Sequence, residues 1–285
     1  MGTSASFGGQ SSSTPLLPSW ADPAGASSPA EGEGQAVGVP PHESGTPDQQ
    51  PLERPAIISP TAPQRFRPFR TNFSKFISSG GSDKKALGRS LRSYVRTASG
   101  GARTAARRVG HERAATAQLI TVLRSFQTTG VAQTLQRFSL AQLANQQPKE
   151  ILAALIDTVC GPGGTIDEGI ARSAYVDALV QTEIGSLESL NEQKIKEITT
   201  QFVINAISLR ICNDIGKKLE QKAISEAQAI NLERELNDFI QGAVKDILGT
   251  QLEKALSMNG QALDSIVLDI YELAFSVIEQ GGEKS

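Results

Sequence analysis

Apolar residues recur at intervals of three and four through most of the chain from residue 114 to its end, and this spacing places them on one face of a helix. The longest such run comprises Leu263, Ile266, Val267, Ile270, Leu273, Ala274, Val277 and Ile278. No segment alternates strictly between apolar and polar residues, which is the pattern of a half-buried strand. The sequence therefore predicts an all-α fold, a helical bundle of three long and several short helices.

Capping and turn residues indicate where the long helices begin and end. Residues 165–168 and 225–228 have the Ser/Thr-x-x-Glu/Gln pattern of a capping box, in which the first and fourth side chains bind free backbone N–H groups. Gly249 is expected to close the second of these helices, because glycine is the usual residue just after a helix end. For the same reason the last helix is expected to stop at Gly281 and Gly282.

Residues 1–63 are rich in Ser, Pro, Gly, Thr and Ala and contain few branched apolar residues. Such a segment buries too little apolar surface to offset the entropy lost on ordering, so a disordered tail is expected. Removal of Met1 leaves the α-amine of Gly2 free, and the first six residues also fit the N-myristoylation pattern. A second candidate is an apolar docking motif made of Leu16, Leu17 and Trp20. The alternative in both cases is an ordinary solvated sequence.

Residues 64–113 contain 13 Lys and Arg residues but only two acids, Asp83 and Glu112. The segments on either side have more acids than bases, so the formal net charge of −2 hides a basic segment between two acidic ones. The chain thus divides into a tail (1–63), a basic segment (64–113) and an acidic all-helical domain (114–285). An anionic surface is expected to meet the basic segment: the acidic domain, a partner protein or a nucleic acid.

The first part of the basic segment interleaves bases with aromatic residues, namely Arg65, Phe66, Arg67, Phe69, Arg70, Phe73 and Phe76. The Phe side chains can anchor this stretch in an acidic groove of a partner protein, with the Arg side chains at the rim. Alternatively, the rings can stack on the bases of a single-stranded nucleic acid while Arg binds phosphates. An unbound linker is the third interpretation, and the residues alone leave all three open.

The second part of the basic segment predicts short helices. An amphipathic helix is expected at about 83–98, with Ser82 as its N-cap, and a second one at 102–109 after two glycines. Their basic side chains are further candidates for binding an anionic partner: Arg89, Arg92, Arg96, Arg103, Arg107 and Arg108.

Few side chains suit catalysis. His42 lies in the tail and His111 among Arg residues, and Cys160 and Cys212 do not have the spacing of a metal site. The Gly-rich residues 161–165 lack the Lys of a phosphate-binding loop. We therefore expect no enzymatic activity, no cofactor and no metal. Two cysteines make no disulfide framework and no apolar run is long enough to cross a membrane, so a reducing, cytoplasmic location is expected.

Several short strings together resemble a known family. They are Met1–Ser4, Thr14–Trp20, Ala86–Gly88 with Tyr94, Gly100–Arg103, Ala106–Arg108, Gly163–Glu168 and Ile170–Arg172. Over nearly the whole chain they resemble the QatB family, the second component of the four-gene Qat anti-phage system. The resemblance implies a non-catalytic component of bacterial antiviral defence. It also implies work beside a P-loop ATPase (QatA), a QueC-like protein (QatC) and a TatD-like nuclease (QatD).

The resemblance suggests a role for the N-terminus that sets myristoylation aside. QueC chemistry activates a carboxylate with ATP and passes it to an amine. An N-terminal glycine is a suitable acceptor, because its amine is unhindered and an α-amino pKa of about 7.7–8.0 leaves part of it neutral in the cell. We therefore expect an adaptor that is also a protein substrate of QatC, its first expected partner, with Gly2 as acceptor. A nucleic-acid sensor that uses residues 64–113 is the alternative.

Overall fold

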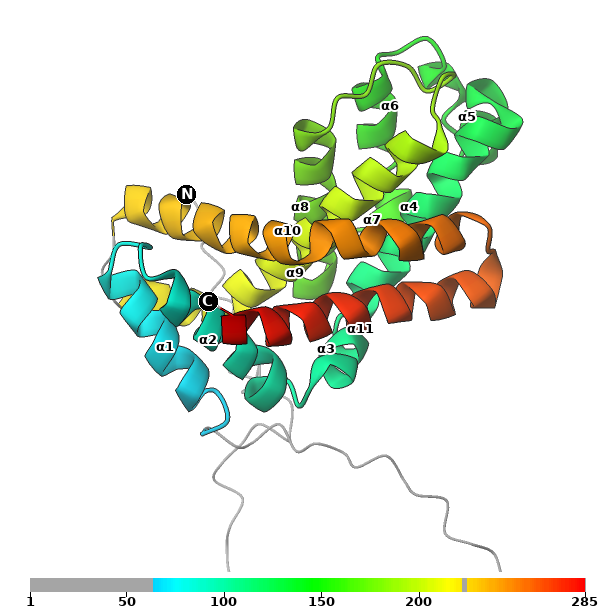
Figure 1. The fold of residues 1–285 in the computed structure, drawn as a ribbon. Coiled ribbons are helices and arrows are strands. Elements are labelled where there is room, and N and C mark those ends of the chain that lie inside the picture. The colour runs from blue at the N-terminus through cyan, green and yellow to red at the C-terminus, as the bar shows by residue number, and fades with distance from the viewer. Residues whose placement is uncertain (1–63, 222–224, 285) are drawn as a thin grey trace, which may run out of the picture. The chain divides into compact units, whose positions relative to one another are not determined.

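The computed structural model describes residues 64–221 and 225–284, and in this part of the chain every regular element is a helix (Figure 1). In chain order they are α1 (Arg67–Ser78), α2 (Lys84–Ser93), the π-helix η1 (Tyr94–Ala98), α3 (Ala102–Arg108), α4 (Gly110–Thr129), α5 (Val131–Arg137), the 3-10 helix η2 (Ala141–Leu143), α6 (Pro148–Ala154), α7 (Ile156–Cys160), α8 (Ile166–Gln181), α9 (Glu192–Gln221), α10 (Glu226–Leu256) and α11 (Gly260–Lys284). The all-α prediction is confirmed, and α9, α10 and α11 are the three long helices. Residues 1–63, with Gly2, Leu16, Leu17 and Trp20, lie outside the described residues.

The long helix α10 packs against α9 on one side and against α11 on another. Its apolar stripe explains this position, because a buried branched residue recurs every four positions at Leu232, Leu236, Ile240, Val244, Leu248 and Leu252. Figure 1 shows α10 and α11 running side by side, and α9 in turn contacts α8 and α4. Burial of these stripes, more than intrinsic helix propensity, stabilises helices of this length.

The basic segment contributes to the same core. Helix α1 packs on α2, and α2 and α3 both pack on α11, so the change of charge near residue 113 does not coincide with a boundary in packing. Helix α1 itself was not among the expected helices. Its signal is present in the sequence, because Pro68 stands in the first turn, where proline is favoured, and a buried face follows at Phe69, Phe73, Phe76 and Ile77.

Both predicted capping boxes are confirmed. The Glu168 backbone N–H donates to the Thr165 hydroxyl oxygen at 3.1 Å, the Thr165 N–H donates to the Glu168 carboxylate at 3.2 Å, and the box at 225–228 has the same pattern. The predicted helix ends at the glycines are wrong. Helix α10 continues through Gly249 to Leu256, and α11 continues to Lys284. A glycine inside a helix costs only about 1 kcal/mol, which the buried apolar side chains on either side of it can offset.

Candidate interaction surfaces

Three of the aromatic residues proposed as partner anchors belong to the hydrophobic core. Phe69, Phe73 and Phe76 are each at most 3% exposed. The Phe69 ring centroid lies 5.8 Å from that of Phe73 and 5.4 Å from that of Tyr94, as in the ordinary packing of aromatic pairs. The prediction that these three rings are free to bind a partner or a base is therefore wrong. Their helical spacing lets α1 bury all three at once, which a solvated segment could not do.

The other residues of the interleaved stretch remain nearer to solvent. Phe66 is half-buried, and the guanidinium groups of Arg65 and Arg70 lie 5.2 and 5.6 Å from its ring centroid. Arg67 and Arg70 are exposed on α1. In this stretch the positive charges thus face solvent, and most of the aromatic surface is buried in the core.

Most of the arginines predicted on α2, η1 and α3 face solvent. Exposed arginines are Arg89 on α2, Arg96 on η1, and Arg103, Arg107 and Arg108 on α3, while Arg92 is half-buried. The elements that carry these arginines, α2, η1 and α3, all pack against α11. The protein's own acids meet the basic segment in part: Lys84 on α2 forms an ion pair with Glu235 on α10. The exposed arginines leave a surface suited to an anionic partner.

A partly buried ion network joins helices α4, α8 and α9. Arg210 on α9 donates from Nε and Nη2 to one oxygen of Glu112 on α4, at 2.9 and 2.5 Å, and from Nη1 to Asp167 on α8 at 2.8 Å. The Glu112 side chain is fully buried, and burial raises its pKa while the Arg210 charge opposes that rise. Close by, the hydroxyl of Tyr94 donates to Asp214 on α9 at 2.8 Å.

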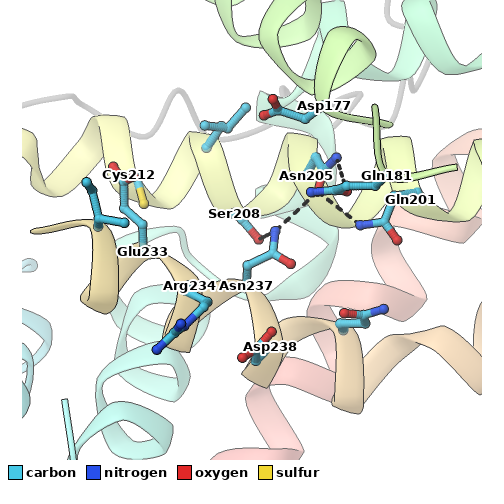
Figure 2. A pocket seen from close by; sticks show the side chains of 13 residues that line it. Asp177, Gln181, Gln201, Asn205, Ser208, Cys212, Glu233, Arg234, Asn237 and Asp238 are labelled. Carbon is cyan, nitrogen blue, oxygen red and sulfur yellow. Dashed lines mark hydrogen bonds between the residues drawn. The ribbon is translucent and has the colours of Figure 1, made fainter. Parts of the chain in front are cut away.

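A polar groove of about 510 Å³ lies among α8, α9 and α10 (Figure 2). Its floor is an amide network around Asn205, which is 2% exposed. The Asn205 Oδ1 accepts from Gln201 and from Asn237, both at 3.2 Å, and its Nδ2 donates to Gln181 at 3.0 Å. Asn237 also donates to the Ser208 hydroxyl at 3.4 Å. Amides are both donors and acceptors, and in this floor many of these groups are hydrogen-bonded to one another.

Charged side chains surround the amide floor. Asp177 on α8 and Glu233, Arg234 and Asp238 on α10 line the groove, and burial raises the pKa of Asp177. Figure 2 shows Asp177 and Asp238 on opposite sides of the amides. The groove was not predicted from the sequence. The available signal was the polar triplet Gln201, Asn205 and Ser208, which recurs at spacings of four and three within the largely apolar middle of α9.

Comparison with known proteins places the chain in a family. Residues 100–278 match the family model described as Qat anti-phage system associated protein QatB. The chain belongs to the QatB family. The matched region extends from α3 into α11 and includes the groove and the Arg210 network. No curated protein and no solved structure matches the chain. The family resemblance expected from the sequence is confirmed, and this QatB-family protein is a component of the Qat anti-phage system.

In this QatB-family protein Cys160 is buried, whereas Cys212 is half-buried and lines the groove. Burial raises the pKa of both Cys160 and Cys212 to about 12, so neither is a ready nucleophile at neutral pH. His111 is exposed on α4. Among the described residues, no group of three or more His, Cys, Asp or Glu side chains could hold a metal ion. None of the described helices combines the length and apolarity needed to cross a membrane.

The Gly-rich loop before α8 has a structural role in this QatB-family protein. Arg172 donates to the Gly161 carbonyl at 2.6 Å and also pairs with Asp157. A methyl group added at Gly163 would lie 3.0 Å from Arg172 Cδ, so the arginine fills the space beside the loop. These contacts and the capping box at 165–168 stabilise the loop that connects α7 to α8.

Proposed function

We propose that this QatB-family protein is a non-catalytic adaptor of the Qat system and a protein substrate of the QueC-like partner QatC, with the Gly2 amine as the acceptor. In that reaction ATP first converts the carboxylate of a deazaguanine to an acyl adenylate, releasing pyrophosphate. The neutral Gly2 nitrogen then attacks the acyl carbon. An amide bond forms, AMP leaves, and the nitrogen loses one proton. QatA and QatD are the further partners that an adaptor would contact.

The proposal depends mainly on one observation, the match of residues 100–278 to the family of a multi-protein defence system. Two features of the described residues support a role in interaction rather than catalysis. Both cysteine thiols have raised pKa values, and exposed arginines project from α2, η1 and α3. Because Phe69, Phe73 and Phe76 are buried in the core, the proposed adaptor surface consists of charged side chains and not of these aromatic rings.

Intact mass spectrometry tests the substrate role. The full-length protein is co-expressed with QatC and, separately, with QatC whose ATP site is inactivated. We expect added mass only with active QatC, and fragmentation should place it on Gly2. Gly2→Pro replaces the primary amine with a hindered secondary one and should abolish the addition, while Ser4→Ala serves as the matched control and should keep it. An unchanged mass with active QatC would refute the substrate role.

A pull-down with QatA, QatC and QatD, each tested separately, examines the adaptor role. One variant reverses the charge at four exposed arginines by replacing each with Glu: Arg89, Arg96, Arg103 and Arg107. A control variant reverses the charge in the same way at four exposed basic residues on other helices: Arg137, Lys149, Lys245 and Lys254. Loss of a partner with the first variant but not with the second supports the adaptor surface. Equal capture by both variants would contradict it.

The same exposed arginines support a second candidate, a nucleic-acid sensor. With three of the aromatic rings buried, base stacking by α1 loses its support, and binding would depend on phosphate contacts. Affinity for DNA or RNA should then fall steeply with salt, with a logarithmic slope of about −0.9 for each phosphate contacted in duplex DNA. A shallow slope together with capture of a Qat partner would favour the adaptor.

A further inference from the structure

A second cavity, of about 360 Å³, lies where the start of α1, the end of η1, α3 and α9 meet. Three guanidinium groups line it, from Arg65, Arg108 and Arg210, and Asp214 is the one carboxylate among its lining residues. The aromatic side chains of Phe66 and Tyr94 form part of its wall. These side chains come from positions 65 to 214, so the fold gathers positive charge from parts of the chain that are far apart in sequence.

The charges around this cavity are not balanced within it. Asp214 already accepts the hydroxyl hydrogen bond of Tyr94 at 2.8 Å. Burial and the neighbouring charge of Arg108 lower the pKa of Arg65, and the charge of Asp214 works in the opposite direction. The positive charges of Arg65 and Arg108 thus act on each other at one cavity, and an anion placed between them would be attracted by both.

Each guanidinium group keeps donors for a ligand. Arg210 uses three N–H groups on Glu112 and Asp167, so within the described residues two of its five donors carry no bond. Arg108 makes one long bond of 3.4 Å, from Nη1 to the Ala98 carbonyl. Arg65 rests its guanidinium over Phe66. Planar guanidinium groups bind phosphate oxygens through paired N–H donors, which makes arginine the preferred residue for phosphate recognition.

We propose that this cavity is a binding site for a phosphorylated small molecule of about mononucleotide size, whose phosphate group Arg65 and Arg108 hold together. The volume lies at the lower end of the range of about 300–1,000 Å³ found for small-molecule sites. The apolar side chains of Ala105 and Val109 complete the wall and suit the uncharged part of such a ligand. The site is independent of the proposed modification of Gly2.

Isothermal titration of the full-length protein with AMP tests the site, with inorganic pyrophosphate and unphosphorylated adenosine as further probes at constant ionic strength. AMP should bind more tightly than adenosine, because only AMP carries the phosphate. Arg65→Gln and Arg108→Gln should each weaken AMP binding about ten- to hundredfold, the usual effect of losing hydrogen bonds to a charged group. The matched control is Arg103→Gln, on α3 but outside the cavity lining, and it should bind AMP like the wild type.

A gain-of-affinity variant separates ligand binding from a structural role. Asp214→Asn removes the one carboxylate of the cavity lining but keeps an oxygen that can accept from Tyr94, so AMP should bind more tightly than to the wild type. Circular dichroism checks that every variant is folded. The proposal is overturned if AMP and pyrophosphate both fail to bind, or if Arg65→Gln and Arg108→Gln bind AMP as the wild type does. Binding of a 20-nucleotide strand without binding of AMP or pyrophosphate overturns it as well.

Discussion

Arg210 and Glu112 meet across the interface of α9 and α4, where two N–H groups of the guanidinium converge on one carboxylate oxygen at 2.9 and 2.5 Å. Glu112 has no exposed side-chain surface, and Arg210 also reaches Asp167 on α8. A single side chain therefore binds acids from two other helices. Breaking a buried pair of this kind leaves a charge without a partner, which is far more costly than losing an ion pair in solvent.

Replacement of Arg210 by Met should lower the free energy of unfolding by about 3–5 kcal/mol at neutral pH. The loss should depend on pH. Without Arg210, the main influence that opposes the effect of burial on the pKa of Glu112 is lost, so the folded state holds its proton more tightly than the unfolded state does. Stability is then retained below the unfolded pKa of Glu112 and lost as the pH rises through its raised folded pKa. Urea denaturation at pH 5 and pH 8 should show the smaller difference from wild type at pH 5.

The double variant Glu112→Leu with Arg210→Met provides the control for this prediction. It removes both charges together and should recover most of the lost stability, as replacement of buried pairs by apolar residues often does. A single variant that stays as stable as the wild type at pH 8 would show that the pair contributes nothing to folding.

Phe76→Ala should destabilise the protein by about 3–5 kcal/mol, because it empties a fully buried position where α1 packs. Arg70→Gln on the exposed side of the same helix should change stability by no more than about 0.5 kcal/mol. Urea unfolding of both variants checks this. If Phe76 were a docking residue, its replacement would weaken partner capture and leave the unfolding transition in place.

The glycines inside α10 should be replaceable with a gain in stability. A methyl group at Gly242 or Gly249 meets no atom within 4 Å, and both have ordinary helical positions. Ala at each should raise the free energy of unfolding by about 0.5–1 kcal/mol. The control is Gly130→Ala at the end of α4, where φ is +84° and ψ is 166°. That region is accessible almost only to glycine, so alanine there should cost about 1–3 kcal/mol. Thermal unfolding distinguishes the two signs.

Cys160 and Cys212 should react slowly with Ellman's reagent in the native protein at pH 8. With pKa values raised to about 12, only roughly one thiol in 10,000 is ionised at that pH. In urea both thiols should react at least about 100-fold faster. Rapid native reaction of Cys212, which lines the polar groove, would mean that the groove stabilises its thiolate, and nucleophilic chemistry would need to be considered again.

The fold class followed from local signals that act within a few residues. The capping boxes at 165–168 and 225–228 and the apolar stripe of α11 were readable because each depends on spacing along one helix. The wrong prediction for Phe69, Phe73 and Phe76 arose because tertiary packing cannot be read from spacing along one helix. An aromatic helix face and an aromatic docking face have the same spacing, and only the packing of α1 against α2 distinguishes them.

The two cavities could not be predicted from the sequence, because each is formed by residues that are far apart along the chain. Arg65 and Asp214, or Gln181 and Asn237, line common sites only after α9 is placed against its neighbours. Gly249 shows the reverse case, in which a local stop signal is overridden because Leu248 and Leu252 are buried on either side of it.

The amides around Asn205 have a consequence for how the long helices align. Apolar stripes tolerate sliding, since one leucine can replace another in a neighbouring gap. Asn205 instead binds Gln181 of α8 and Asn237 of α10 through opposite ends of one side chain. A shift of α9 by one turn, about 5.4 Å, would break both hydrogen bonds and leave the buried amide of Asn205 without these two partners. The cluster therefore selects one alignment of three helices among those that the core alone would accept.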